Sequence, residues 1–254
     1  PIFWRDWRAA RLRRRRRRRA LVSSANRACE ALLDRLTAMR TNEQILRSVF
    51  PTYWIETYGC AFNAADSETL EAELLEAGWR QAAGESDADV VVLNSCTVKD
   101  RTVWEFQKRL RSLLERRAAT GKPGVVVAGC VPLANPDEPL LDQAVLLGPR
   151  SLSRIAEAAE TARGGIRSAL LEAAGERRLR LPRRRRNPIL EILPINQGCL
   201  GHCAYCQTRL ARGELLSFPI ADIVERARRA IGEGARELWL TSQDTGAYGA
   251  DIGT

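Results

Sequence analysis

The stretch ADVVVLNSC, residues 88–96, places four consecutive apolar residues between an aspartate and an asparagine and ends in a cysteine. A short apolar run of this kind, rich in β-branched residues, is typical of a strand that is buried on both faces. The same arrangement occurs in YWIETYGC, residues 53–60, and in GVVVAGC, residues 124–130. These three stretches therefore predict three strands that each lead into a cysteine.

Helical patterns fill the gaps between the predicted strands. In NAADSETLEAELLEAG, residues 63–78, apolar residues recur every three or four positions, and VKDRTVWEFQKRLRSLLERRA, residues 98–118, is compatible with a second helix. A helical crossover returns the chain to the sheet in the same direction. We therefore predict an α/β fold whose N-terminal domain is an open, Rossmann-like parallel sheet.

Three cysteines fall just past the carboxyl ends of these predicted strands. Cys60, Cys96 and Cys130 are separated by 36 and 34 residues. Loops at the carboxyl ends of parallel strands form the binding crevice of an open α/β sheet, so the three thiols are expected to converge at one sheet edge. The alternative is that cysteine occurs at these positions only as a small buried residue.

A second group of cysteines is packed into eight residues. CLGHCAYC, residues 199–206, has the spacing Cys-x3-Cys-x2-Cys and follows EILPINQG, residues 191–198, which is predicted to be a strand. The motif is thus a loop at the carboxyl end of a strand, where barrel enzymes place their chemistry. Its three thiols belong to Cys199, Cys203 and Cys206.

Three thiolates without a fourth protein ligand suit a 4Fe-4S cluster that keeps one iron free for an exogenous ligand. A structural zinc ion would require a fourth ligand. The only histidine, His202, lies inside the second motif, and its spacing favours a solvated loop position over a metal ligand. Zinc remains an alternative at this point.

The net charge of +9 is concentrated at the N-terminus. Ten arginines among residues 1–19 are offset only by Asp6, so residues 20–254 are neutral overall. Such a run stays solvated, and residues 1–51 are expected to be a basic, disordered extension with a possible helix around Cys29. Residues 1–38 are expected either to lie upstream of a natural start at Met39 or to be a disordered arm. An organelle presequence is a further alternative.

No cleavable signal peptide and no apolar run long enough to span a bilayer occur in the sequence. A reducing compartment is therefore expected, in which clustered thiols bind metal rather than form disulfides.

With both groups of thiols in view, the chain resembles the radical methylthiotransferases. The resemblance is carried by YGCAFNAADSE (58–68), NSCTV (94–98), AGCVP (128–132) and CLGHCAYC, and it covers about residues 52–254. The segments PINQGCLGHCAYCQTRLARGELLSFP (194–219) and LWLTSQDTGAYGADIGT (238–254) look most like the archaeal and eukaryotic branch that modifies N6-threonylcarbamoyladenosine (t6A) in tRNA.

This resemblance implies four segments along the chain. Residues 1–51 form the basic extension, 52–160 the cluster domain, 161–188 a basic linker, and 189–254 the start of a radical S-adenosylmethionine partial (β/α) barrel.

The resemblance also implies two 4Fe-4S clusters and S-adenosylmethionine as cofactors. One cluster, with S-adenosylmethionine on its open iron, would generate a 5′-deoxyadenosyl radical, and a second S-adenosylmethionine would supply the methyl group of the methylthio product. The implied partners are tRNA and an electron donor of unknown identity, and the implied location is cytoplasmic. The expected ligands are Cys60, Cys96 and Cys130 for the auxiliary cluster, and Cys199, Cys203 and Cys206 for the radical-generating cluster.

Beyond the cysteines, two residues are expected to contact cofactor. Tyr205 is expected to pack against the cluster or the adenine of S-adenosylmethionine. TSQDTG, residues 241–246, lies where the resembling enzymes bind the amino group of S-adenosylmethionine; glutamate is usual at the position of Gln243, which makes Asp244 the better candidate. No catalytic residue is assigned.

Other polar residues near the motifs have two interpretations each. Asn63 and Asp66 are predicted mainly to cap the helix that follows Cys60, with a cluster or substrate role as the alternative. Asn94 is predicted to tie its loop by bonding to backbone. Arg212 is expected to meet a carboxylate or phosphate, or to lie in a surface ion pair.

The predicted linker contains GERRLRLPRRRRNP, residues 175–188. Its arginines are expected either to hold RNA phosphates, without sequence preference, or to form a solvated linker.

Only 48 residues follow the second cysteine motif, whereas six βα units would require about 180. The barrel is therefore expected to be incomplete, with an exposed edge, and the chain is expected to lack turnover by itself. Three function classes remain open: modification of t6A in tRNA, the same chemistry on isopentenyladenosine tRNA or a ribosomal protein, and a non-catalytic iron-sulfur or zinc module.

Overall fold

The computed structural model describes residues 50–97, 100–172 and 178–253. The chain divides into two compact units, Pro1–Phe50 and Pro51–Thr254, and all elements described below belong to the second. The predictions for Cys29 and the arginine run lie outside the described residues.

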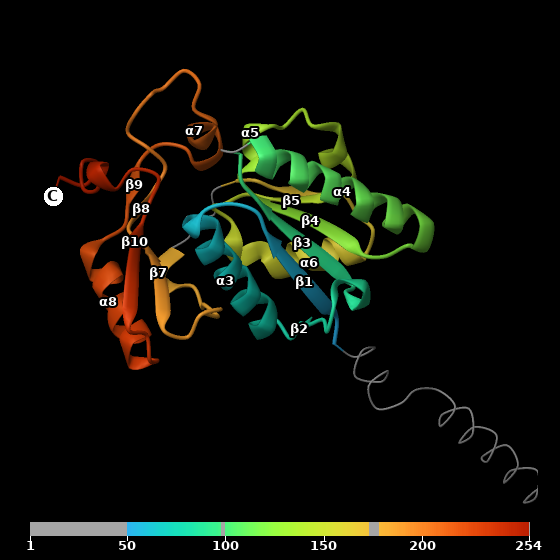
Figure 1. Ribbon diagram of the computed structural model, residues 1–254, viewed down its shortest axis with the longest axis horizontal. Helices are drawn as coiled ribbons and strands as arrows, with labels where there is room; N and C mark the ends of the chain where they lie inside the picture. Colours follow the sequence, from blue (N-terminus) through green and yellow to red (C-terminus); the bar gives the residue numbers. More distant parts are fainter. Residues whose placement is uncertain (1–49, 98–99, 173–177, 254) are drawn as a thin grey trace, which may run out of the picture. The chain divides into compact units, whose positions relative to one another are not determined.

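A parallel sheet forms the N-terminal part of the second unit. Its strands are β1 (Thr52–Thr57), β2 (Arg80–Gln81), β3 (Val90–Ser95), β4 (Gly124–Gly129), β5 (Val145–Leu147) and β6 (Ala169–Leu170). They are ordered β2-β1-β3-β4-β5-β6 (Figure 1), and every neighbouring pair is parallel. The three predicted strands are β1, β3 and β4, which lie side by side, and the predicted α/β fold is confirmed.

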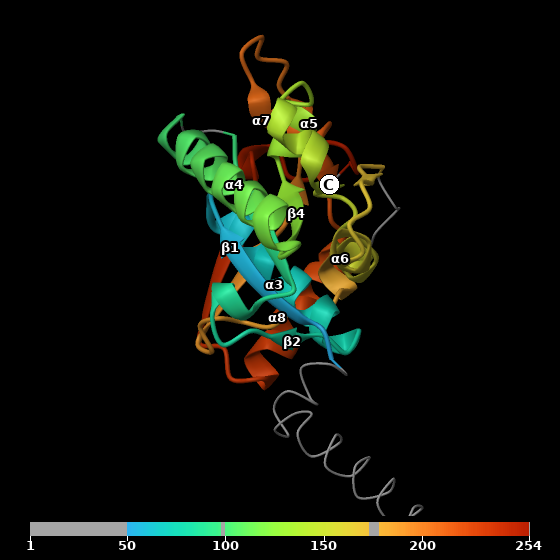
Figure 2. The ribbon, with the colours of Figure 1, turned by 90° about the vertical axis from the view of Figure 1, so that its right-hand side faces the viewer.

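Helices cover both faces of this sheet. They are α3 (Ala61–Glu76), α4 (Asp100–Thr120), α5 (Val131–Ala134) and α6 (Ile155–Arg163). Because side chains alternate across a strand, Val90 and Val92 of β3 pack in one core cluster with residues of α3 and α6, whereas Val91 and Leu93 pack in another with residues of α4. Helix α4 lies on one face of the sheet and α6 on the other (Figure 2), so the two cores lie on opposite faces. The sequence of β3 is continuously apolar because both of its faces are covered.

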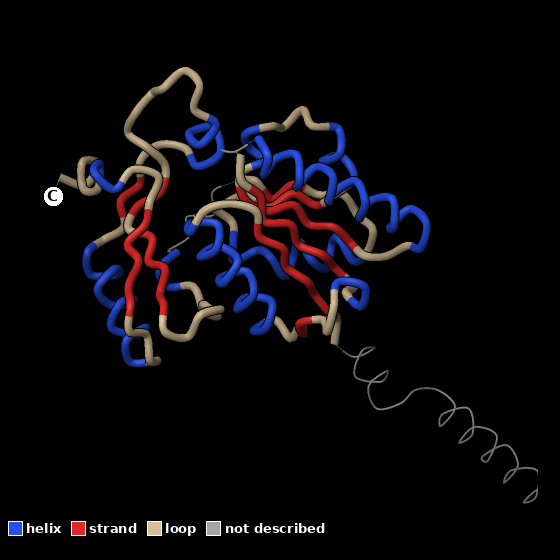
Figure 3. Tube along the Cα trace, in the orientation of Figure 1, coloured by secondary structure: helices blue, strands red, loops and turns tan. Residues whose placement is uncertain are grey.

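A second, smaller set of strands follows. Its elements are β7 (Leu190–Pro194), β8 (Asn196–Gln197), α7 (Gln207–Arg212), β9 (Leu216–Ser217), α8 (Ile220–Gly232) and β10 (Glu237–Thr241). Strand β7 pairs in parallel with β10, and β8 pairs antiparallel with β9. These strands are separate from the six-stranded sheet (Figure 3). A parallel pair joined through α8 is the predicted start of a (β/α) barrel. Among the described residues β10 pairs only with β7, and its Trp239 and Leu240 are 48% and 60% exposed, as expected for an open edge.

The predicted linker differs from what the structure contains. Helix α6 continues past residue 160 to Arg163, and Ala169–Leu170 pair with β5 as the last strand of the sheet. Residues 169–170 pair with the sheet because Leu170 packs in the core cluster that contains Leu147 and Ile155.

The arginine run within this segment is not uniformly solvated. The side chains of Arg183 and Arg185 are 1% and 9% exposed, and both are directed at the fully buried Glu191 of β7, with N–O distances of 2.8 and 3.8 Å. Arg226 of α8 donates to the same carboxylate at 2.8 Å. A buried carboxylate requires such counter-charges, and burial beside Arg226 lowers the pKa of Arg183 to about 10.

Across residues 50–97, 100–172 and 178–253, no helix is both long enough and apolar enough to cross a membrane.

Candidate functional site

The first three cysteines lie at one edge of the parallel sheet. Strands β1, β3 and β4 are adjacent, with Thr57 opposite Asn94 and Ser95 opposite Gly129 in the ladders. Because Cys96 and Cys130 directly follow β3 and β4, and Cys60 follows β1 by three residues, all three emerge at the same carboxyl edge. The structure therefore places at one sheet edge the cysteines that the sequence spaces more than 30 residues apart.

Glycines allow these three loops to touch. Gly59 has φ +150°, and a Cβ added there would lie 2.8 Å from the Cβ of Cys96. Gly129 has φ +90°, and a Cβ added there would lie 2.9 Å from the backbone nitrogen of Ser95. Both contacts are closer than a side chain permits. The loop before Cys60 is therefore packed on Cys96, and the loop before Cys130 on the end of β3.

A buried amide network fixes the same edge. Asn94 Nδ2 donates to the backbone oxygen of Asn63 at 2.8 Å, which confirms the predicted bond from Asn94 to backbone. Asn63 Nδ2 donates in turn to the backbone oxygen of Ser95 at 3.1 Å, and its Oδ1 lies 3.4 Å from Cys60 Sγ. The prediction that Asn63 caps the helix is wrong, because α3 begins at Ala61 and Cys60 occupies the cap position.

The three thiols differ in exposure. Cys60 is exposed, whereas Cys96 and Cys130 are each 5% exposed. Cys60 and Cys130 immediately precede α3 and α5. Backbone N–H groups in the first turn of a helix have no intrahelical partner. In α5 the N–H of Val131 donates instead to Ser95 Oγ at 3.3 Å, so the carboxyl end of β3 also holds the start of this helix.

The second trio forms a tight loop between β8 and α7. Gly201 lies inside it: a Cβ added there would be 3.6 Å from Cys199 Sγ and 3.9 Å from Cys203 Sγ. The two sulfurs therefore lie around the same point of the loop. Gly201 N–H donates to Cys199 Sγ at 3.3 Å, and Cys206 N–H donates to the backbone oxygen of Cys203 at 3.1 Å.

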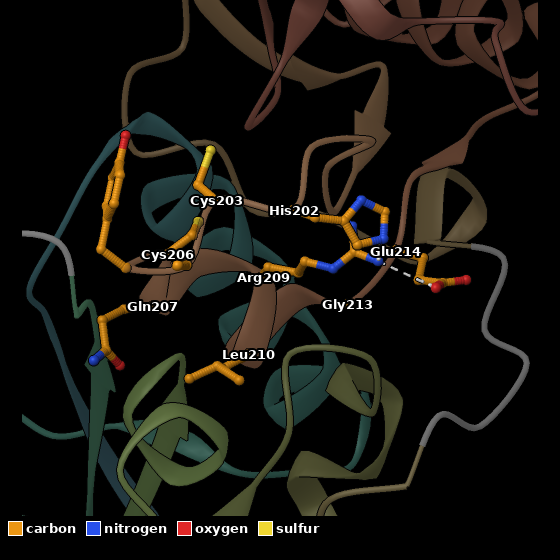
Figure 4. Close-up of a pocket in the computed structure, with 10 residues that line it drawn as sticks. His202, Cys203, Cys206, Gln207, Arg209, Leu210, Gly213 and Glu214 are labelled. Carbon is orange, nitrogen blue, oxygen red and sulfur yellow. Dashed lines mark hydrogen bonds and ion pairs between the residues drawn. The ribbon is translucent and has the colours of Figure 1, made fainter.

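Arg209 of α7 fastens this loop, and the sequence interpretation missed it. Its Nη1 donates to the backbone oxygens of Cys199 and Gly201 at 2.9 and 2.7 Å, and its Nη2 lies 2.9 Å from His202 Nε2 and 3.2 Å from a carboxylate oxygen of Glu214 (Figure 4). The available signal was its position three residues after Cys206, on a helix that turns it back toward the loop.

A cavity of about 550 Å³ adjoins the loop and is lined by both cysteine and polar side chains. Cys203 and Cys206 lie on its wall (Figure 4). Tyr205 lines the same cavity. Tyr205 is 87% exposed, so its ring is available to a ligand rather than packed in the fold. His202 is also exposed, as predicted for a solvated loop residue.

The loop after β10 contacts the cysteine loop, because β10 lies parallel to β7. Gln243 Oε1 accepts from the backbone N–H of Gly198 at 2.9 Å, so this side chain holds the start of the cysteine loop. Asp244 Oδ2 lies 3.9 Å from Cys199 Sγ, and Asp244 Oδ1 accepts from the backbone N–H of Ala247 at 3.3 Å. The structure thus places the Asp244 carboxylate beside the first cysteine of the trio.

The prediction for Asp66 is wrong, whereas that for Arg212 is confirmed in one of its two alternatives. Asp66 does not cap α3, because it lies well inside the helix; its fully buried carboxylate accepts from Arg212 Nη2 at 2.7 Å. Arg212 therefore meets a carboxylate, in a buried pair and not a surface one.

The two trios approach each other through the helices that follow them. Helices α5 and α7 are in contact, and Cys130, Ala134 and Ala211 form one buried cluster. Cys130 directly precedes α5 and Cys206 directly precedes α7.

These residues fit the 4Fe-4S clusters by donor type, since each site offers three thiols and thiolates favour iron-sulfur clusters. In the described part of the chain, no three His, Cys, Asp or Glu side chains are close enough to hold one metal ion. A structural zinc ion would need a fourth protein ligand beside each trio, and it remains the alternative to a cluster.

The first trio coincides with a known family. Residues 52–146 match the model described as "Uncharacterized protein family UPF0004", and this range contains β1, β3 and β4 together with Cys60, Cys96 and Cys130. The match to this family therefore covers the part of the chain that carries the first three cysteines.

The relatives extend beyond that domain. The chain is 41% identical over 208 residues to the threonylcarbamoyladenosine tRNA methylthiotransferases of Danio rerio and of Homo sapiens, and 40% identical over 202 residues to the probable threonylcarbamoyladenosine tRNA methylthiotransferase of Methanothermobacter thermautotrophicus. Each match covers 79% of this chain and 37%, 35% and 47% of the relative, respectively. The relationship to the archaeal and eukaryotic branch that the motifs predict is confirmed, and the chain spans less than half the length of these relatives.

Among solved structures, a radical S-adenosylmethionine methyltransferase from Kitasatospora setae aligns with a TM-score of 0.49 and 16% identity. The alignment covers 76% of this chain and 48% of that chain.

Proposed function

We propose that this chain contributes both cluster-binding sites of a tRNA methylthiotransferase that converts t6A next to the anticodon to its 2-methylthio derivative. One observation supports this most directly. One cysteine trio follows three adjacent parallel strands, the other lies in the loop after β7 and β8, and the helices α5 and α7 that follow them are in contact. The names of the relatives support the choice of t6A as substrate.

In this proposal each trio has a distinct role. The first would hold an auxiliary 4Fe-4S cluster, and the second would hold the cluster that, with S-adenosylmethionine, supplies a 5′-deoxyadenosyl radical. The ligands would be Cys60, Cys96 and Cys130 for the auxiliary cluster, and Cys199, Cys203 and Cys206 for the radical-generating one.

The remaining residues position ligands around the second trio. Arg209 holds the cysteine loop by its backbone oxygens. Asp244, beside Cys199, is the candidate acceptor for the amino group of S-adenosylmethionine. Tyr205 presents an exposed ring at the cavity wall, where the adenine can pack on it.

The substrate, the electron donor and the cytoplasmic location are proposals for the whole protein. We expect the 254-residue chain to bind clusters and to lack turnover, because the described barrel contains one parallel strand pair with an exposed outer strand. The same chemistry on isopentenyladenosine tRNA or a ribosomal protein, and a non-catalytic cluster module, are the alternatives.

The test is anaerobic reconstitution of the full-length protein with iron and sulfide, followed by incubation with reductant, S-adenosylmethionine and t6A-containing tRNA. Mass analysis of the nucleosides is expected to detect 2-methylthio-t6A. Parallel reactions with isopentenyladenosine tRNA and with ribosomal protein distinguish the substrates. A fully reconstituted protein that leaves t6A unchanged contradicts the proposed substrate.

A second prediction concerns the arginine run. Arg184 and Arg186 have side chains that are 50% and 46% exposed, and they line a cavity of about 400 Å³ with Trp54 and Glu71. Their distances to the Glu71 carboxylate, 3.4 and 3.9 Å, leave both guanidinium groups accessible to a phosphate. The slope of log affinity for tRNA against log salt is negative, and replacing both arginines by glutamine is therefore expected to reduce its magnitude by roughly 1 to 2.

The control replaces Arg154 and Arg163 by glutamine. These two arginines pair with Glu157 and Glu160 on α6. Their replacement removes the same amount of positive charge from another surface. Filter binding of tRNA between low and moderate salt measures both slopes. Equal slopes in the Arg184/Arg186 variant and the wild type contradict an RNA contact at this cavity.

A further inference from the structure

A buried group of four side chains lies between the segments that carry the two cysteine trios. We name it the arginine clamp, and its members are Phe62, Asp66, Arg178 and Arg212. The Asp66 carboxylate accepts from Arg212 at 2.7 Å through one oxygen and pairs with Arg178 through the other. The guanidinium carbons of Arg178 and Arg212 lie 4.6 and 4.5 Å from the centre of the Phe62 ring. All four residues are at most 3% exposed.

The clamp joins segments that are distant in the sequence. Phe62 and Asp66 are four residues apart and lie on one face of α3, whose cap residue is Cys60. Arg212 is the last residue of α7, whose cap residue is Cys206. The preceding residue, Ala211, packs with Cys130 and Ala134. Helix α7 is therefore fixed to α3 by the clamp and to α5 by an apolar contact.

The charges of the clamp do not balance. Two guanidinium groups share one carboxylate, and burial together with the nearby Arg212 lowers the pKa of Arg178 well below its ordinary value. The Phe62 ring offsets part of the free energy that burying two guanidinium groups costs, since a cation over an aromatic face is attracted to that face. Well-packed apolar side chains stabilise a contact at least as well as buried ions do. A buried ion pair instead fixes the relative orientation of the segments that it joins. The planar guanidinium can bind a carboxylate and stack on a ring at the same time in one orientation only.

We propose that the arginine clamp is a positioning device that holds α7, and with it the Cys206 end of the cysteine loop, in one arrangement against α3 and α5. Phe62, Asp66 and Arg212 are thus positioning residues for the two thiol trios and not ligands. This inference rests on the proposed function for its purpose, because only a pair of clusters sharing one substrate requires their sites to be fixed relative to each other.

The first test requires no cluster. Hydrogen exchange is followed by mass spectrometry in the wild type and in Arg212→Met. Amides of residues 199–213 are expected to exchange at least about tenfold faster in the variant, whereas amides of β3 and β4 keep their protection. Unchanged exchange in 199–213 overturns the inference, as does equal acceleration in β3 and β4.

The matched control is Arg226→Met. Arg226 is also buried, at 3% exposure, and Glu191 then retains Arg183 just as Asp66 retains Arg178. The substitution Arg226→Met removes a buried arginine from the contact between α8 and β7. The amides of α8 and β7 are therefore expected to exchange faster, and those of residues 199–213 to exchange at the wild-type rate. Loop acceleration equal to that in Arg212→Met overturns the inference.

The second test uses the reconstituted, reduced 254-residue chain and electron paramagnetic resonance. The wild type is expected to show a magnetic interaction between its two clusters that is absent when Cys96→Ala or Cys203→Ala removes one of them. Asp66→Asn, with iron content matched to the wild type, is expected to weaken and broaden this interaction, and Arg212→Lys, which keeps the charge but not the planar stack, to weaken it less. An identical interaction in all three proteins, or none in the wild type, overturns the inference. A chain that binds no iron refutes the proposed function instead. The hydrogen-exchange experiment then decides by itself whether the arginine clamp positions α7 and the cysteine loop.

Discussion

Replacing Cys96 with alanine is expected to remove about half of the iron that the chain binds after anaerobic reconstitution, because in the proposed function each trio would hold one cluster of the same size. Cys96 is 5% exposed and follows a fully buried strand, so neither water nor a nearby side chain can readily take the place of its thiolate. Cys203→Ala is expected to remove the other half. The measurement is iron and sulfide per chain, together with the visible absorption of the clusters.

The remaining cysteine provides the control for this experiment. Cys29 lies outside both trios, and Cys29→Ala is expected to bind as much iron as the wild type. Alanine is smaller than cysteine and suits a buried position, so the parallel sheet should survive all three substitutions, which circular dichroism can verify. Full iron content in Cys96→Ala would remove Cys96 from the ligand set.

Replacing Gly198 with alanine is expected to abolish the second cluster while the first remains. Gly198 has φ +72°, and a Cβ there would lie 2.6 and 2.7 Å from the carbonyl carbon of Glu214 and the backbone oxygen of Gly213. These are backbone atoms, which cannot rotate away as a side chain does. The left-handed conformation and the overpacking together cost about 3 kcal/mol or more, so the loop that begins with Cys199 is expected to move. Iron content is expected to fall by about half, as in Cys203→Ala.

The variant Gly234→Ala separates the cost of the left-handed backbone conformation from the cost of overpacking. Gly234 has φ +98°, but nothing lies within 4 Å of the added Cβ. This variant is therefore expected to lose about 1 kcal/mol of stability from backbone conformation alone and to retain both clusters. Thermal unfolding and iron content measure the two effects. A Gly198→Ala chain with full iron would show that the cysteine loop tolerates this displacement.

The parallel sheet and its thiols could be predicted because their signals are local. Runs such as Val90–Leu93 and Val125–Ala128 are apolar throughout, since both faces of β3 and β4 are covered. Parallel strands present their carboxyl ends at one edge, so a cysteine after each strand is brought to that edge by topology alone. The spacing of Cys199, Cys203 and Cys206 within eight residues is likewise a property of one segment.

Other residues could not be assigned from the sequence, because their partners are far away along the chain. Asp66 looked like a helix cap, yet its partner Arg212 is 146 residues distant. The run Arg183–Arg186 looked uniform, but alternate residues differ: Arg183 is committed to the buried Glu191, whereas Arg184 is half exposed. Arg209 gave no distinctive signal, because a basic residue on a short helix is common on protein surfaces.

The sequence by itself determined the α/β class, the three central strands of the sheet, and the two sets of thiols. These depend on periodicity and spacing, which are encoded by residues close together in the chain. Only the tertiary structure decided how the two sets are joined, through the contact of α5 with α7 and the arginine clamp between α3 and α7. Pairing of buried charges depends on which segments meet when the chain folds, and no local pattern specifies the partner that a buried aspartate or arginine will find.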